Sequence, residues 1–270
     1  MGELSEVTPT QRVEHFELRE GVEIEVTTAS GDVHLVEGET GTVRLTTTDA
    51  DPATRLERVE CIYDPAANRL SIDTKVLKGL GTDKGKGLGR ALKGMIGYAR
   101  NDVDVEVAVP RGARVRLRTA SGDLVAEATL GGAEVASASG DVRLGSVEGS
   151  VKVQTASGEL SLGRVVGPVS AKLVSGEVRV EALEGDLSVQ SVSGDVIAAV
   201  VAPGRVDVGN VSGDVTVAVR TGLLVELDVR SVSGQVSSQI ALDGSTGEAD
   251  ERPVTVKVRS VSGDVQVRRA

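Results

Sequence analysis

The chain has 270 residues and a formal net charge of −10, an acidic balance that disfavours nucleic acid, because phosphate binding needs a concentrated basic surface. The aromatic residues are Phe16, Tyr63 and Tyr98, without tryptophan, which argues against stacking on bases or sugars. Cys61 is the only cysteine, so an intramolecular disulfide is excluded.

The first residues differ from the rest of the chain. Residues 1–19 hold few apolar positions and include Pro9, so we expect a flexible lead or cap. They show neither the basic start nor the apolar core of a secretory signal, although a signal removed earlier would leave the same sequence. No stretch of about eighteen apolar residues predicts a membrane span. The sequence therefore predicts a cytoplasmic protein, with peripheral membrane attachment as an alternative.

A single β-solenoid domain is expected over residues 20–268. From Val22 the apolar alternation predicts a strand, and residues 28–35 already match the later repeat. Residues 56–62 and 70–72 are expected to pair as strands around a turn at 64–68. These early coils are irregular.

A basic, glycine-rich insertion interrupts the domain at residues 76–100. Between residues 75 and 100, seven basic side chains stand against Asp83 alone, and the second half carries apolar residues on one helical face. We expect a mobile insertion, a helix that covers the solenoid, or a site for a partner protein or an anionic membrane surface. The residues that would carry such binding are Lys84, Lys86, Leu88, Arg90, Leu92, Lys93, Met95, Ile96 and Arg100.

Glycine recurs every nine residues from Gly122 to Gly194, and the positions two and four residues after each glycine are apolar. Ser-Gly-Asp or Ser-Gly-Glu appears at every second glycine, so the full unit is eighteen residues. Each half supplies one strand and one turn, and stacked units about 4.8 Å apart enclose a Val/Leu/Ala core. The sequence predicts an all-β fold, a single-stranded parallel β-solenoid or β-helix with coils of two nine-residue halves. A flattened, two-sided coil is favoured over a three-sided one, and its handedness is left open.

After Ser193 the Ser-Gly spacing lengthens, and the extra residues enter at the opposite turn, including an acidic loop at 243–253. Repeat proteins often bind partners at the edge that accepts insertions. Uncovered strand edges at the end of a solenoid would template further stacking. The acidic loop and the terminal Arg268–Arg269 are expected to block the C-terminal end.

Two polar columns follow the repeated glycines. The serines are interpreted as structural, because a nucleophile needs a nearby base and only His15 and His34 are present. The neighbouring acidic column is a weak candidate for cation binding, against screening by water or bonding to the turn backbone. Its members are Asp123, Asp141, Glu159, Glu177, Asp195 and Asp214. No metal site, catalytic residue or cofactor is assigned, and an enzyme is not expected.

Three strings carry a family resemblance: Thr119-Ala-Ser-Gly-Asp-Leu, Thr155-Ala-Ser-Gly-Glu-Leu and Ser191-Val-Ser-Gly-Asp-Val, preceded by the Pro110-Arg-Gly turn. They resemble the bacterial β-strand-repeat "putative adhesin" family, a domain of unknown function related to the Toastrack domain, over residues 20–268. The resemblance implies a β-solenoid without established enzymatic activity. Relatives occur near cell-envelope stress systems and are often tethered to the membrane.

The leading interpretation is a non-enzymatic interaction scaffold of the envelope stress response, with its flat sheets or variable edge as the contact surface. One alternative is a structural protein that associates end to end into filaments. A surface adhesin is the other alternative and requires export. The protein partner and the oligomeric state are left open.

Overall fold

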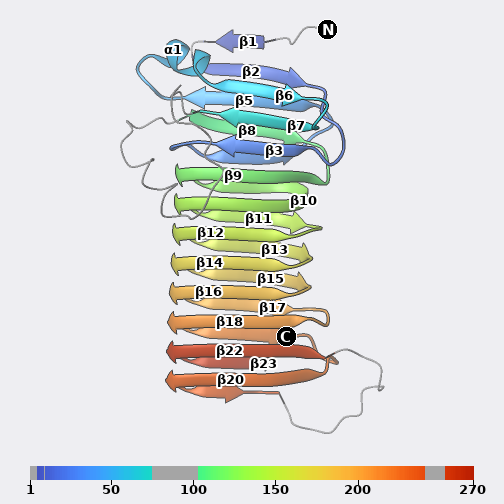
Figure 1. Cartoon of the computed structure of the whole chain (residues 1–270), viewed down its shortest axis with the longest axis vertical. Helices are drawn as coiled ribbons and strands as arrows, with labels where there is room; N and C mark the ends of the chain where they lie inside the picture. Colours follow the sequence, from blue (N-terminus) through green and yellow to red (C-terminus); the bar gives the residue numbers. More distant parts are fainter. Residues whose placement is uncertain (1–4, 9, 75–102, 241–252) are drawn as a thin grey trace. The chain divides into compact units, whose positions relative to one another are not determined.

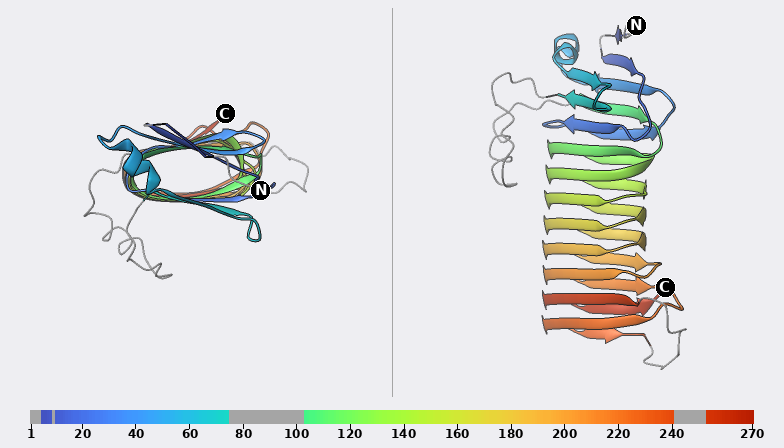
Figure 2. Two further views of the ribbon diagram at one scale, coloured as in Figure 1. Left: turned by 90° about the horizontal axis from the view of Figure 1, so that it is seen from above. Right: turned by 45° about the vertical axis from the view of Figure 1, so that its right-hand side comes forward.

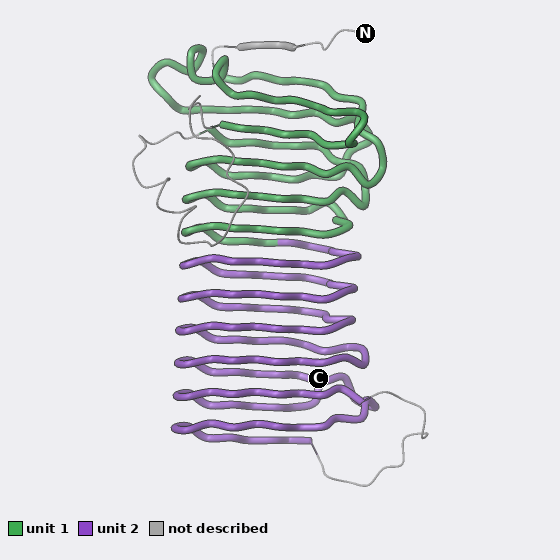
Figure 3. Tube along the Cα trace, viewed as in Figure 1, with its two compact units in different colours: residues 1–143 green, residues 144–270 purple. Residues whose placement is uncertain are grey.

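The computed structural model describes residues 5–8, 10–74, 103–240 and 253–270, whose regular secondary structure is almost entirely β-strand. The predicted fold class, a parallel β-solenoid, is confirmed by the strand pairing given below. Two compact units divide the chain, unit 1 at residues 1–143 and unit 2 at residues 144–270 (Figure 3). No helix among the described residues is long and apolar enough to cross a membrane.

Unit 1 combines a short helix with strands of both orientations. Its elements are β1 (Ser5–Thr8), β2 (Gln11–Phe16), β3 (Glu23–Thr27), β4 (Val33–Glu37), β5 (Gly41–Thr47), α1 (Pro52–Glu57), β6 (Glu60–Asp64), β7 (Arg69–Asp73), β8 (Val103–Val109), β9 (Ala113–Ser121) and β10 (Leu124–Ser139). Strand β11 (Val142–Val147) crosses the division between the units.

The order of strands in unit 1 differs from their order in the chain. Strand β3 lies between β7 and β9, and β4 lies between β8 and β10, all in parallel pairs (Figure 1). Strands β1, β2, β5 and β8 pair antiparallel in that order, which places the residues expected as a lead or cap in two strands. Phe16, on β2, is buried near the ring of Tyr63, with ring centroids 6.3 Å apart.

A helix occupies part of a segment for which the sequence predicts a strand. Strand β6 begins at Glu60, and α1 ends at Glu57, so the expected strand start at residue 56 is wrong. Asp51 caps α1 through its side chain and Pro52 stands in the first turn, both common helix-start signals. Arg55 donates to Asp49 at 2.8 Å, and this hydrogen bond lowers the pKa of the Asp49 carboxyl. The expected hairpin at 64–68 forms between β6 and β7.

Among the described residues of unit 2, the regular secondary structure consists of strands alone. They are β12 (Val151–Ser157), β13 (Leu160–Val166), β14 (Val169–Ser175), β15 (Val178–Glu184), β16 (Leu187–Ser193), β17 (Val196–Val200), β18 (Arg205–Ser212), β19 (Val215–Val219), β20 (Val225–Ser233), β21 (Val236–Ser238), β22 (Val254–Ser262) and β23 (Val265–Arg269).

These strands form two parallel rows, so each coil of unit 2 has two sides (Figure 2). One row runs β12, β14, β16, β18, β22, β20, and the other runs β13, β15, β17, β19, β23, β21. The serines of the Ser-Gly turns stay in register through the first row. Inward Val, Leu and Ala side chains of the successive strands are almost wholly buried, except on the coil formed by β20 and β21.

The order of coils in the stack of unit 2 differs from their order in the chain. The coil formed by the last residues, β22 and β23, does not lie at the end of the stack. Strands β22 and β23 lie between β18/β19 and β20/β21 (Figure 1). Arg269 therefore sits one coil from the end, where its Nη1 donates to the carbonyl oxygens of Arg220 and Leu223 at 3.3 and 2.9 Å. The expectation that Arg268–Arg269 block the C-terminal end is wrong, because β20 and β21 form that end. The acidic loop at 243–253 lies, except for Pro253, outside the described residues.

Candidate functional site

The acidic turn column forms a hydrogen-bonded ladder in unit 1. Asp104 accepts the backbone N–H of Asp32 at 2.9 Å, and Asp32 accepts that of Asp123 at 2.9 Å. Asp123 in turn accepts the N–H of Asp141 at 2.8 Å. Each carboxylate thus satisfies a turn donor of the adjacent coil, which accounts for the aspartates without a cation.

A ladder of the same kind is present within unit 2. Asp195 accepts the N–H of Asp214, Asp214 that of Asp264, and Asp264 that of Gln235, each at 2.8 Å. Gln235 lies on the outermost coil of the described residues, so no further described turn in this row needs a carboxylate. This position explains why the acidic column ends in an amide.

The two glutamates of the column occupy the turns before β13 and β15. Glu177 accepts a hydrogen bond from Arg179 at 2.5 Å, and Glu159 is also engaged in a polar interaction. In the residues that the structure describes, no group of three acidic, histidine or cysteine side chains is placed to hold a metal ion.

A second polar row was not identified from the sequence. It is formed by the residues two positions before the turn serines. Most of its hydroxyls donate to the carbonyl two residues later and so close the turn, as Thr119 does to Ser121 at 3.0 Å and Thr155 to Ser157 at 2.8 Å. The buried Ser191 hydroxyl is an exception, with no hydrogen-bond partner among the described residues. The exposed serines bond the adjacent coil, for example Ser175 to the carbonyl of Ala156 at 3.3 Å. Both rows therefore stabilise turns. The signal was present as a Thr or Ser two residues before most Ser-Gly pairs, with Leu173 and Asn210 as the exceptions.

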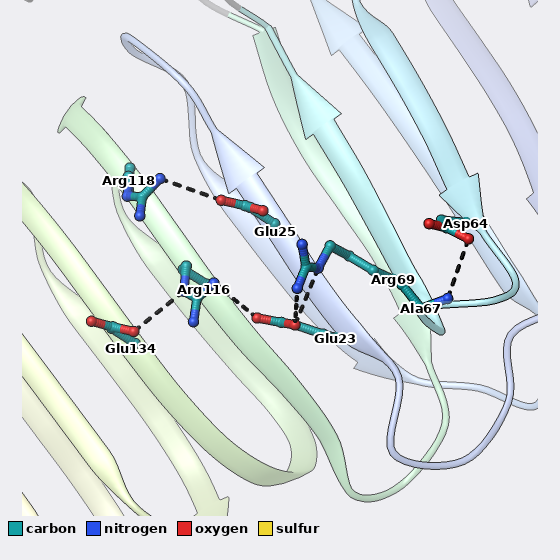
Figure 4. A network of polar contacts seen from close by, with 8 residues as sticks. All are labelled: Glu23, Glu25, Asp64, Ala67, Arg69, Arg116, Arg118 and Glu134. Atoms are coloured by element: carbon teal, nitrogen blue, oxygen red, sulfur yellow. Dashed lines mark hydrogen bonds and ion pairs between the residues drawn. The ribbon is translucent and has the colours of Figure 1, made fainter. Parts of the chain in front are cut away.

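Charged side chains on one outer face of unit 1 neutralise one another (Figure 4). Glu23 on β3 pairs with Arg69 on β7 at 2.9 Å and with Arg116 on β9 at 3.0 Å. Arg116 also reaches Glu134 at 3.2 Å, on β10. The network joins β3 to β7 and β9, its neighbours in the sheet that are not adjacent in the sequence. Because positive and negative side chains alternate in it, this surface does not favour a polyanionic ligand.

A row of exposed valines follows the Ser-Gly edge of unit 2. The residue before each turn serine points outward, and strand register stacks these residues in neighbouring coils. Four are 47–54% exposed and the last is 83% exposed. In stacking order the valine row is Val174, Val192, Val211, Val261 and Val232. The equivalent positions are the smaller Ala29, Ala120 and Ala138 in unit 1, and Ala156 on β12 of unit 2.

Polar rows flank the valine row on both sides. The outward position two residues earlier holds Lys172, Gln190, Gly209, Arg259 and Arg230, while the turn acids lie on the other side. An apolar stripe with a polar rim is the arrangement found at protein contact surfaces. Sequence reasoning missed it because the spacing of apolar residues around each glycine does not show that these valines point outward.

The basic segment predicted to bind a partner or a membrane falls outside the described residues. This applies to every position assigned there, from Lys84 to Arg100. Among the predicted site residues, the structure therefore places only the six of the acidic column.

The chain is similar to a known protein family and to solved structures. The family model described as Toastrack DUF4097 matches residues 22–268. No curated protein matches the chain. A "putative adhesin" from Bacteroides fragilis is similar to 97% of this chain over 98% of its own, with 13% identity and a TM-score of 0.53, which shows a shared fold. A "putative adhesin" from Parabacteroides merdae aligns with 96% of each chain at 10% identity and a TM-score of 0.35.

Proposed function

The chain belongs to the Toastrack DUF4097 family, and from that premise we propose that it is a non-enzymatic interaction scaffold of the bacterial envelope stress response. It binds a protein partner through the valine row of unit 2. The observation that carries this proposal is the alignment of half-exposed valines along one edge, where a row of polar side chains would serve solubility better.

The chemistry of the row favours a polypeptide partner. Removing exposed valine side chains from water stabilises a complex by about 25 cal/mol per Å² of apolar area. The flanking basic and acidic rows supply the polar rim that fixes register and orientation. Because the coils repeat about every 4.8 Å, the five valines form a continuous apolar stripe that several apolar side chains of one polypeptide can cover.

Site-specific photocrosslinking tests this surface. We expect a photoreactive residue at Val192 or Val211 to give a protein adduct in the cells that produce the chain. The matched control is Ser188, which is also exposed on the outer face of β16 but lies at its other end. We expect no adduct from Ser188, because it lies away from the valine row.

Two further comparisons make the result specific. Replacement of Val211 and Val261 by serine is expected to remove the adduct formed at Val192 while leaving the circular dichroism spectrum unchanged. The yield is expected to change when the cell envelope is stressed. Equal labelling from Ser188 and Val192 would count against the row as the contact surface, and a yield unaffected by stress would count against the envelope role.

A further inference from the structure

Strand β20 is the outermost strand of its row in unit 2. In the part of the chain that the structure describes, β22 is the only strand that pairs with it. The opposite edge of β20 therefore presents backbone N–H and C=O groups that no described strand satisfies. Such an edge is a template for pairing with another strand.

The inward side chains of this coil are partly exposed. Val254, Val256 and Val258 on β22 are fully buried, whereas Leu227 on β20, which is in register with Val256, is 39% exposed. On β21, Val236 is 47% exposed, although its partner Val265 is buried. The end of the core is thus an apolar surface bordered by two free strand edges.

The sequence of β20 is self-complementary in charge. Asp228 and Arg230 flank Val229, and all three stand at the centre of the strand. In an antiparallel pair of two β20 strands centred on Val229, each Asp228 would face Arg230 of the other copy. Opposite charges directly across an antiparallel pair stabilise it.

We propose that the C-terminal end of unit 2 binds the same end of a second copy, with β20 paired antiparallel to β20 about Val229. The contact continues the core from one copy into the other. Each Asp228 already contacts Arg230 of its own strand at 3.2 Å, and in the dimer it also faces Arg230 of the other copy. Because both copies use the same surface, the contact is isologous and closes as a dimer. It therefore yields a finite pair and no filament, and it leaves the valine row free for a different partner.

Charge reversal on the full-length chain tests this arrangement by sedimentation equilibrium. The wild type is expected to dimerise with rising concentration. Asp228→Arg and Arg230→Asp are each expected to weaken the dimer about tenfold or more, because like charges then face each other. An equimolar mixture of the two variants is expected to restore dimers, as is the double variant D228R/R230D.

The matched control is Asp207→Arg on β18. Asp207 pairs with Arg205 two residues away, as Asp228 does with Arg230, but its strand has neighbours on both sides. We expect this variant to dimerise like the wild type. Each variant must retain the wild-type circular dichroism spectrum, and the wild-type melting temperature at a concentration low enough that all the proteins are monomeric, to be scored.

Three results would overturn the proposal. A wild type that stays monomeric at high concentration would mean that another occupant, such as residues 241–252 of the same chain, covers the edge. A dimer that the mixture of variants fails to restore would exclude pairing about Val229. Continuous growth with concentration would indicate head-to-tail assembly.

Discussion

Replacing Val258 with aspartate is expected to lower the free energy of unfolding by about 4 kcal/mol or more, because it places a carboxylate inside the core. The same substitution at Val229, the residue in register with Val258 on the neighbouring strand, is expected to cost less than about 1 kcal/mol. Val258 is fully buried, while Val229 lies at the uncovered end of unit 2.

Urea unfolding followed by circular dichroism measures both effects. It should be done at low protein concentration, so that self-association does not contribute to the stability of the variants. If the coils followed chain order, Val258 would lie on the outermost coil and Val229 would be covered. The larger loss would then belong to Val229→Asp, which would contradict the out-of-order position of β22.

The second large effect is expected at Gly176. Its φ is +126°, and a Cβ atom there would lie 2.0 Å from the carbonyl oxygen of Gly158 in the adjacent coil. Alanine must therefore separate two coils and also adopt an unfavourable backbone conformation. We expect Gly176→Ala to cost about 3 kcal/mol or more in unfolding free energy.

Two control glycines separate the causes. At Gly163 a Cβ would lie 2.2 Å from the oxygen of Gly145, but the residue lacks a left-handed φ, so only close approach is tested. At Gly222 φ is +95° with open space around it, so only backbone strain is tested, at about 1 kcal/mol. Thermal melting should rank Gly222→Ala as the mildest change. A loss at Gly222 equal to that at Gly176 would show that contact between coils is unimportant.

The fold class follows from local spacing and could be predicted. The alternation of apolar residues around each glycine determines the strand, the turn and the face that is buried. Every regular coil repeats this arrangement. The helix α1 was missed because Leu56 fits both a strand and a short capped helix. Its Asp51-Pro52 start was the available signal.

The order of coils could not be predicted from the repeat. The coils that contain Ser212, Ser233 and Ser262 carry the same inward columns, so any of them can stack on another. One departure was informative, since Gln235 replaces the acidic residue on the coil that has no further neighbour. The meaning of that change appears only when the backbone donors of the adjacent turn are known.

The acidic column could be identified from the sequence, but the hydrogen-bond partners of its carboxylates could not. The carboxylates bond N–H groups that are as many as 91 residues away in the chain, as between Asp32 and Asp123. The valine row likewise depends on which coils are neighbours, because Val261 lies between Val211 and Val232.

The order of coils in unit 2 determines both the valine row and the open end, and disulfide trapping tests it most directly. With Cys61 replaced by serine, cysteines at Ser212 and Ser262 occupy adjacent, in-register strands about 4.8 Å apart, within the range for a disulfide. We expect this pair to oxidise to an intramolecular crosslink, and the pair at Ser212 and Ser233, two coils apart, to remain reduced. Efficient crosslinking of Ser212→Cys to Ser233→Cys, without crosslinking to Ser262→Cys, would contradict the position of β22 between β18 and β20.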